Sequence, residues 1–409
     1  MLTIEPAQRR RAGRSKLAIA LAGGGPLGFF YELGALHALS EAIEGRNLTE
    51  FDVYVGVSSG SLIAAALASG FDTAAMCAMF LHDESILFPF SPAILLRPAF
   101  GEYARRLSHL PKVLTEIVQR CARDPGRGAW KAAIGPLGRL LPTALFDNAP
   151  LQDYLQLLFN SESHTDDFRK LKARLYVVAT NLNTGESVPF GGAHHQDVPI
   201  SRALLASSAL PGLYPAVQID GDHFVDGALT RTMHASLALE EKCNFVICVN
   251  PLVPFDASHA LVQRSINLVD EGLPAMLGQT FRAFIHSRMK VGMATYGARF
   301  PTADTLLLEP DRHDERLFFA NVFRYAERLG LADHAYRRTR RDLLAQADAL
   351  APLLERRGLR LNIGVLRDRN RSLPSATRTT SPRVRQTTRR LKLALARIEH
   401  LLQEPGGAG

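Results

Sequence analysis

The stretch Tyr54–Gly70, YVGVSSGSLIAAALASG, decides the fold. Its first residues continue a short apolar run that is typical of a buried strand, and SLIAAALASG has the composition of a buried helix. Between the two lies Gly56-Val57-Ser58-Ser59-Gly60. A buried hydroxyl is costly unless it is hydrogen-bonded. The junction is therefore either a tight turn with serine caps or a turn that holds one serine outward.

The same pattern occurs earlier in the chain. KLAIALAGGGPLG predicts a strand and a glycine turn, and FFYELGALHALSEAI follows with apolar residues at helical spacing. A strand, a glycine turn and a helix, twice in succession, predict parallel strands joined by crossovers, an α/β fold. Two later stretches, ARLYVVATN and NFVICVN, predict further strands.

Composition narrows the class of protein. Of the 409 residues, 46% are hydrophobic and 22% are charged, as in ordinary globular proteins. The four cysteines are scattered and form no CxxC pair, which argues against a disulfide framework and against a metal site and fits a reducing compartment (Cys77, Cys121, Cys243 and Cys248). The apolar run 17–22 is too short for a signal peptide, and Asp72 with several Gly and Ser residues interrupts the run 53–81. We expect no signal peptide or transmembrane helix, and a cytoplasmic protein.

The chain divides by composition into four parts. We expect a disordered basic leader over 1–15, an α/β domain over 16–252 with a helical, basic insertion at about 84–148, a helical C-terminal extension over 253–357, and a basic, flexible tail over 358–409 with a short amphipathic helix. The oligomeric state is not indicated.

The net charge of +8 is unevenly spread. Nine Lys or Arg and three acids lie between Ser85 and Leu145, and nine basic residues with one acid lie between Arg367 and Lys392. Such stretches suit phospholipid head groups or nucleic acid, or are simply solvated surface. The second stretch has no aromatic residue on which a base could stack, so it would attract phosphates without recognising a specific nucleic acid.

Gly56-x-Ser58-x-Gly60 between a strand and a helix is the context of a nucleophile elbow. The small residues let the backbone turn sharply, and Ser58 would stand at the helix N-terminus, where free N–H groups and the helix dipole favour a developing negative charge. The N–H of Ser59 would help to hold an oxyanion. The alternative is a serine-rich helix cap.

The glycine run adds a second part of such a site. Gly23, Gly24 and Gly25 would aim unobstructed amides at one oxygen, as acyl transfer requires. The competing interpretation is a dinucleotide loop, because Gly23, Gly25 and Gly28 satisfy G-x-G-x-x-G. That motif needs an acid after the next strand, whereas the nearest acids precede it (Glu44, Glu50 and Asp52).

A serine nucleophile needs a base. Several histidines are available, but none stands in a distinctive loop (His234, His259, His286, His313 and His334). IDGDHFVDGALT predicts a short hairpin with Asp226 at a strand end, followed by the small pair Gly227 and Ala228. An unperturbed Asp is a poor base at pH 7, and partial burial beside a serine hydroxyl would raise its basicity.

Three separated elements, Gly23–Gly28, Gly56–Gly60 and Asp226–Ala228, resemble the patatin-like phospholipase family in order and context, and the resemblance extends from about Lys16 to Val249. It implies a three-layer α/β sandwich with a mostly parallel central sheet. It also implies Ser58 as nucleophile and Asp226 as general base, without a catalytic histidine. The oxyanion hole would draw on Gly24 and Gly25 with their neighbours, Gly23 and Ser59. The reaction would be hydrolysis of phospholipid or other acyl-lipid esters without a cofactor.

Two departures from the family pattern keep an alternative open. Leu27 stands where the glycine loop usually carries Arg or Lys, and LTRTMHAS replaces the usual Asn and Pro pattern after the Asp motif. The first hypothesis is an active lipid hydrolase whose basic insertion docks on an anionic membrane, peripherally at its inner surface. The second is a lipid-binding or regulatory protein on the same fold, with weak or no turnover.

Overall fold

The computed structural model describes residues 1–9, 14–82, 90–123, 136–161, 164–258, 268–270, 272–320 and 325–377. The chain divides into two compact units. Unit 1 comprises Met1–Ser91, Leu171–Tyr176 and Met233 onward, and unit 2 comprises Pro92–Lys170 and Val177–Thr232. This division cuts across the boundaries expected from composition, which stay a prediction.

Unit 1 holds the parallel part of the fold. Four strands pair in parallel in the order β10-β9-β2-β4, and β1 adds to β10 in the antiparallel sense (β1 Leu2–Glu5, β2 Leu17–Leu21, β4 Val53–Val57, β9 Phe245–Val249 and β10 Asp304–Leu308). Every residue of β2, β4, β9 and β10 is buried, which explains why these strands read as unbroken apolar runs. A small pair, β3 Ile43–Glu44 with β11 Arg360–Leu361, lies apart from this sheet.

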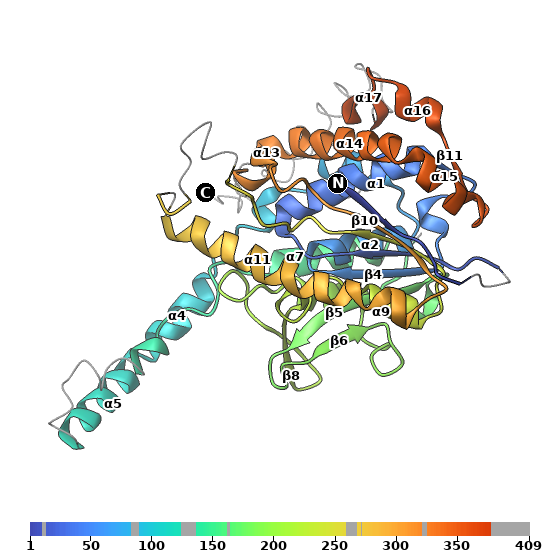
Figure 1. The fold of residues 1–409 in the computed structure, drawn as a ribbon. Coiled ribbons are helices and arrows are strands. Elements are labelled where there is room, and N and C mark those ends of the chain that lie inside the picture. Colours follow the sequence, from blue (N-terminus) through green and yellow to red (C-terminus); the bar gives the residue numbers. More distant parts are fainter. Residues whose placement is uncertain are drawn as a thin grey trace, which may run out of the picture. The chain divides into compact units, whose positions relative to one another are not determined.

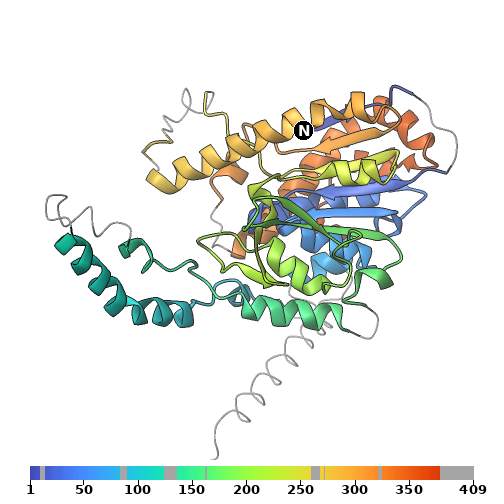
Figure 2. The ribbon, with the colours of Figure 1, turned by 90° about the horizontal axis from the view of Figure 1, so that it is seen from below.

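Helices cover both faces of these parallel strands. In Figures 1 and 2, α1, α2 and α14 lie on one face, and α9 and α11 lie on the other. Within the described residues, the helices of this unit are α1 Gly25–Ala42, α2 Ser59–Ala68, α3 Thr73–Phe80, α9 Ala235–Glu240, α11 Gly272–Ala294, α12 Tyr296–Arg299, α13 Glu315–Phe318, α14 Arg328–Ala345, α15 Ala347–Glu355, α16 Ile363–Arg367 and α17 Leu373–Thr377. The predicted three-layer α/β architecture with a mostly parallel sheet is confirmed.

Unit 2 is antiparallel. It contains most of β5 Arg174–Asn181, which pairs with β6 Ser187–Phe190 on one side and with β8 Asp222–Asp226 on the other, and β7 Val217–Ile219 follows at the edge. The predicted hairpin is present, and its turn places Asp220 and Gly221 at φ of 50° and 90°. The helices are α4 Phe100–Ser108, α5 Leu110–Arg123, α7 Ala149–Phe159 and α8 Ile200–Ser207. Both α4 and α5 lie in the predicted helical insertion.

Two expectations that concern strands need correction. The leader over 1–15 is not disordered throughout, because Leu2–Glu5 forms β1 and the Leu2 side chain is buried. The predicted helical extension over 253–357 contains β10, whose run DTLLL pairs with β9. Short apolar runs cannot be assigned to strand or helix by periodicity alone, and each of these strands is fixed by a partner far away in the sequence.

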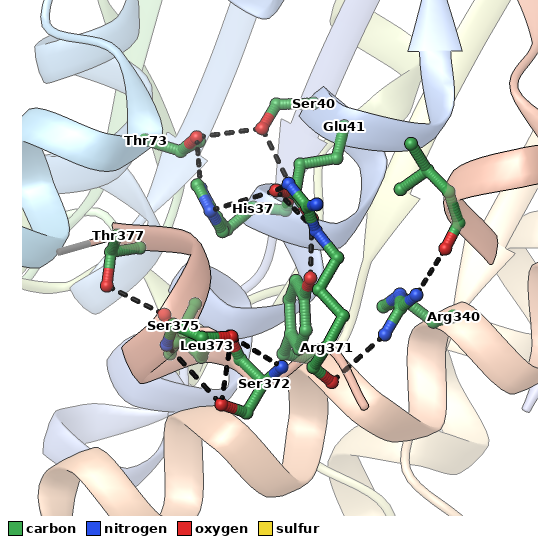
Figure 3. A network of polar contacts seen from close by, with 12 residues as sticks. His37, Ser40, Glu41, Thr73, Arg340, Arg371, Ser372, Leu373, Ser375 and Thr377 are labelled. Atoms are coloured by element: carbon green, nitrogen blue, oxygen red, sulfur yellow. Dashed lines mark hydrogen bonds and ion pairs between the residues drawn. The ribbon is translucent and has the colours of Figure 1, made fainter. Parts of the chain in front are cut away.

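Residues 358–377, expected to be flexible, form β11, α16 and α17. Figure 3 shows the polar network that holds them to α1 and α14. Arg371 bonds to the Glu41 carboxylate of α1, and Arg340 of α14 donates to the backbone carbonyls of Val365, Asp368 and Arg371. The rest of the tail, with its predicted amphipathic helix, lies outside the described residues. Among the helices of the described ranges, none combines the length and apolarity needed to cross a membrane.

Candidate active site

The junction between β4 and α2 is a strained turn centred on Ser58. The residue has φ 51° and ψ −126°, a backbone conformation that residues other than glycine rarely adopt. Such backbone strain costs about 1–3 kcal/mol and persists only where the surroundings impose it. Ser58 occupies the N-cap position of α2, yet its side chain makes no capping hydrogen bond. The helix-cap interpretation of this serine is therefore not supported.

The two glycines of the motif are needed for space rather than for an unusual φ. A Cβ on Gly56 would lie 2.4 Å from the Cα of Ser61, and a Cβ on Gly60 would lie 2.5 Å from the carbonyl oxygen of Ala22. Real Cβ atoms essentially never approach so closely. The spacing G-x-S-x-G thus marks the two positions where the turn packs against itself and against the end of β2.

Ser61 closes the first turn of α2 on the nucleophile candidate. Its N–H and its hydroxyl both donate to the carbonyl oxygen of Ser58, at 2.9 and 2.5 Å. Ser58 itself is 7% exposed. The backbone at this position is consequently fixed from both sides, by close packing and by hydrogen bonds.

The glycine loop lies directly beside this turn, because β2 and β4 are adjacent parallel strands whose carboxyl ends meet at one edge. The N–H of Gly24 donates to the hydroxyl of Ser59 at 3.0 Å, so the two loops are bonded to each other. Gly25 begins α1 with φ +59°. A Cβ on Gly24 or on Gly28 would meet the ring of Pro251, at 2.5 and 2.9 Å.

This geometry alters the role expected for two residues. Ser59 was expected to act through its backbone N–H, and the structure shows that its hydroxyl also ties the elbow to the glycine loop. The N–H of Gly24 is engaged by that bond. The sequence contains no local signal for this contact, since it joins residues 35 positions apart through the pairing of β2 with β4.

Asp226 belongs to unit 2, at the end of β8. It is 3% exposed, and its Oδ1 accepts the N–H of Ala228 at 2.8 Å. Its own N–H donates to the carbonyl of Ala209, and its carbonyl accepts the Thr180 hydroxyl. Gly227, Ala228 and Leu229 form the short 3-10 turn that this carboxylate caps. Strand pairing and this turn therefore hold the Asp226 backbone in place.

The candidate residues thus fall in two units. The structure brings Ser58, Ser59, Gly23, Gly24, Gly25, Gly28, Gly56 and Gly60 together in unit 1, and Asp226, Gly227 and Ala228 together in unit 2. Two histidines considered as alternative bases are paired with acids elsewhere, His286 with Glu309 and His334 with Asp314. His259 lies outside the described residues. The part of the chain that the structure covers holds no cluster of three His, Cys, Asp or Glu side chains suited to a metal ion.

Two solved structures of bacterial proteins are similar to this chain at low sequence identity. They are VipD from Legionella pneumophila, 17% identical over 64% of this chain and 55% of the other with a TM-score of 0.32, and the type III effector ExoU, 16% identical over 83% of this chain and 66% of the other with a TM-score of 0.28.

Two relatives are similar in sequence. Both are named "cGAMP-activated phospholipase": one from Vibrio cholerae serotype O1, 25% identical over 54% of this chain and 56% of its own length, and one from Pseudomonas aeruginosa, 26% identical over 56% of this chain and 57% of its own length. The chain thus spans little more than half the length of these relatives. The family model described as "Patatin-like phospholipase" matches residues 19–239, which include the glycine loop, the elbow and Asp226. The chain belongs to the patatin-like phospholipase family.

Proposed function

We propose that this protein is a serine hydrolase that cleaves fatty-acyl esters of phospholipids through an acyl-enzyme on Ser58, with Asp226 as general base. The observation that carries the proposal is the strained backbone of Ser58 at the N-terminus of α2. A serine that is held at positive φ by two close-packed glycines, and that does not cap its helix, is positioned as a nucleophile. The family to which the chain belongs supports the same chemistry.

The reaction proceeds in two halves. Ser58 Oγ attacks the acyl carbonyl carbon, Asp226 takes the hydroxyl proton, and the ester C–O bond breaks as that proton passes to the leaving alcohol. Water then attacks the acyl-enzyme, Asp226 takes a proton from the water and returns one to Ser58 Oγ, and the fatty acid leaves. No cofactor takes part in these steps.

The oxyanion formed in each half needs N–H donors nearby. The helices α1 and α2 both begin where the parallel strands β2 and β4 end, with Gly25 and Ser59 as their first residues. Because Gly24 already donates to Ser59, we assign the hole chiefly to the amides of Gly25 and Ser59, with Gly23 and Gly24 shaping the loop. Loss of one such donor typically costs about 2.7–4 kcal/mol of transition-state stabilisation.

The test is release of fatty acid from phosphatidylglycerol vesicles by wild type, Ser58→Ala and Asp226→Asn. We expect each variant to lose at least about a thousandfold in turnover, since a dyad fails when either member is removed. The matched controls are Ser69→Ala at the other end of α2 and Asp220→Asn in the turn before β8, both of which should retain activity. Vesicle binding by wild type without turnover of any acyl ester would favour the lipid-binding alternative.

A second part of the proposal concerns how the protein meets its substrate. The helices α4 and α5 expose several large apolar side chains, among them Phe100, Leu107, Leu114 and Val118. The basic residues of the insertion are partly neutralised, because Glu102 pairs with Arg105 and Arg106, and Glu116 pairs with Arg120 and Arg139. We therefore assign to this insertion a peripheral contact with the inner surface of an anionic membrane, made mainly by its apolar side chains.

A further inference from the structure

A pocket lies beside the glycine loop, and all of its lining residues belong to unit 1. Leu27 and Gly28 form one side of it, α11 contributes Arg282, and the segment after β10 contributes Asp311 and Asp314. Gly24, which is bonded to Ser59 of the elbow, also lines the pocket. The loop itself carries no charged residue from Gly23 to Gly28, so the charge in this pocket comes from other elements.

The two acids of the pocket are occupied by α14. Asp311 Oδ2 pairs with Arg338 at 2.5 Å, and Asp314 Oδ2 pairs with His334 at 2.6 Å. Burial acts to raise the pKa of Asp314, but the hydrogen bond and charge of His334 outweigh it and the pKa is lowered. Both carboxylates are thus ionised, and each forms an ion pair with a side chain of α14.

Arg282 is in a different situation. Its guanidinium lies 4.6 Å from the centre of the Phe318 ring, and among the ion pairs of the described ranges none includes Arg282. Burial lowers the pKa of this guanidinium, yet an arginine stays protonated at neutral pH. Arg282 thus lines the pocket as a partly desolvated cation, and the two carboxylates of the pocket are paired with α14 rather than with it. Such a cation can bind an anion.

The pocket offers a second cation at its edge. The Arg312 side chain is exposed and also lines the pocket. Hydrogen bonds from Ser258 are the main cause of the lowered pKa of Asp256, and the charges of His313 and Arg312 lower it further. A guanidinium presents paired N–H donors that match the oxygens of a phosphate, whereas an uncharged head group would leave Arg282 without a partner.

We propose that Arg282, assisted by Arg312, forms an anion subsite beside the glycine loop that binds the phosphodiester of a phospholipid substrate. The inference rests on the proposed function, because it places the head group of that substrate next to the elbow that would attack its acyl ester. Leu27 supplies an apolar wall to this subsite, and the positive charge comes from Arg282 of α11 and from Arg312 in the segment after β10.

The first experiment compares substrates with and without a phosphate. The 409-residue chain is assayed for hydrolysis of phosphatidylglycerol and of monoolein, a neutral acylglycerol, in the same neutral detergent micelles. We expect Arg282→Met to raise the KM for phosphatidylglycerol by about tenfold to a hundredfold, as befits loss of a charge-assisted contact, and to leave kcat and the KM for monoolein nearly unchanged. Arg282→Lys should restore most of the preference, because it keeps the charge.

The control variant is Arg288→Met on the same helix. Arg288 also stacks over a phenylalanine, Phe284, at 5.4 Å, but it lies outside the pocket. It should leave the KM of both lipids unchanged. Equal losses on both lipids in Arg282→Met would reveal a purely structural role, and no change on either would also overturn the subsite.

The second experiment measures binding and does not depend on turnover. Titration calorimetry of the full-length chain uses sn-glycero-3-phosphoglycerol, inorganic phosphate and glycerol. We expect wild type to bind the glycerophosphodiester, Arg282→Met to lose at least about tenfold in affinity, and glycerol not to bind. Inorganic phosphate bound as tightly as the diester would overturn the assignment to a lipid head group.

The two experiments separate the two proposals. Binding that depends on Arg282, without hydrolysis of any ester, would support the subsite and defeat the proposed function. Hydrolysis of both lipids with no dependence on Arg282 would leave the function standing and defeat the subsite.

Discussion

The backbone of Ser58 is strained, and contacts with neighbouring residues hold it in that conformation. The residue sits at φ 51°, with the carbonyl of the same residue held by two donors from Ser61. The close approach of Gly56 to Ser61 and of Gly60 to Ala22 leaves the turn no room to relax. The strained backbone of Ser58 is thus held in place by the contacts around it.

This packing predicts the effect of a single methyl group. Gly60→Ala would push a Cβ against the Ala22 carbonyl, so we expect the free energy of unfolding to fall by about 1–3 kcal/mol and ester hydrolysis to fall with it. Urea denaturation measures the first and fatty-acid release the second. Gly278→Ala on α11, where nothing lies within 4 Å of the added Cβ, is the matched control and should be neutral or stabilising by up to about 1 kcal/mol. Equal stability of the two variants would contradict the packing argument.

The sequence predicts which residues form the turn around Ser58, but it does not predict which residues contact that turn. The spacing of Gly56, Ser58 and Gly60 predicted the turn, because only small residues fit where a strand folds back into a helix. The bond from Gly24 to Ser59 and the packing of Pro251 on the loop depend on which strands are neighbours. Neither could be predicted from residues that are adjacent in the chain.

Among the helices, α1 is tightly packed against its neighbours. It begins at the glycine loop and is buried on nearly all sides, and at Gly34 an added Cβ would lie 2.1 Å from the Ala332 carbonyl of α14. Near its C-terminal end, His37 and Glu41 enter the network of Figure 3. His37 Nδ1 lies 2.9 Å from the Thr73 hydroxyl, and Glu41 bonds to Arg371 and Tyr336.

This network predicts a dependence of stability on pH. Burial lowers the pKa of His37 below its ordinary value of 6.5; the nearby Glu41 and Asp72 act to raise it and Arg371 to lower it. Between the two pKa values the unfolded chain binds a proton at His37 that the folded chain does not. The contribution of His37 to stability therefore falls as the pH drops below about 6.5 and levels off below its lowered pKa.

The measurement is the free energy of unfolding by urea across pH 5–8. His37→Gln should show a shallower decline below pH 6.5 than wild type, because the glutamine binds no proton in either state. His194→Gln, at an exposed position, is the control and should follow the wild-type slope. A slope unchanged by His37→Gln would show that this histidine does not contribute to the decline.

The sequence predicted elements well where a local pattern was complete. The units β2–α1 and β4–α2 and the hairpin of β7 and β8 each contain their own turn signal. It missed β1 and β10, since their runs LTIE and DTLLL have no turn chemistry of their own and gain their structure from β10 and β9 respectively. Residues 358–377 were missed for the same reason, because their order depends on α1 and α14.

For the whole molecule, the basic composition overstates the charge that is available for binding. The net charge is +8, but several arginines of the insertion are engaged by Glu102 and Glu116. The pKa of Glu102 is lowered to about 2: burial acts to raise it, and hydrogen bonds from Arg106, Thr143 and Arg105 outweigh that effect. Two carboxylates offset only part of the charge of these four arginines, and α4 and α5 expose large apolar side chains beside them.

Membrane binding should therefore depend more on apolar residues than on salt. Leu107 and Val118 are 66% and 67% exposed, and we expect Leu107→Asp with Val118→Asp to lower binding to phosphatidylglycerol vesicles at least about tenfold. Raising the salt from 0.1 to 0.5 M shortens the Debye length from about 10 Å to about 4 Å, and it should weaken binding of wild type less than that. Co-sedimentation measures both.

The control for that experiment is Leu157→Asp on α7, a leucine that is 56% exposed and lies in the same unit. It should bind vesicles as wild type does. Full retention of binding by the double variant would remove the insertion from membrane contact and leave the proposed hydrolase chemistry untouched.

The pairing of β2 with β4 has a consequence for how the protein is made. The glycine loop and the elbow are both contained between Leu17 and Ala68, in a continuous β-α-β-α segment. Ribosomes deliver the N-terminal part of a chain first, and contacts between residues near in sequence form fastest. The turn that holds Ser58 at its strained φ can thus take shape while Asp226 has still to be synthesised. Under the proposed chemistry, a nascent chain would carry a nucleophile without its base, and the cell's own lipids would be spared until translation has passed the end of β8.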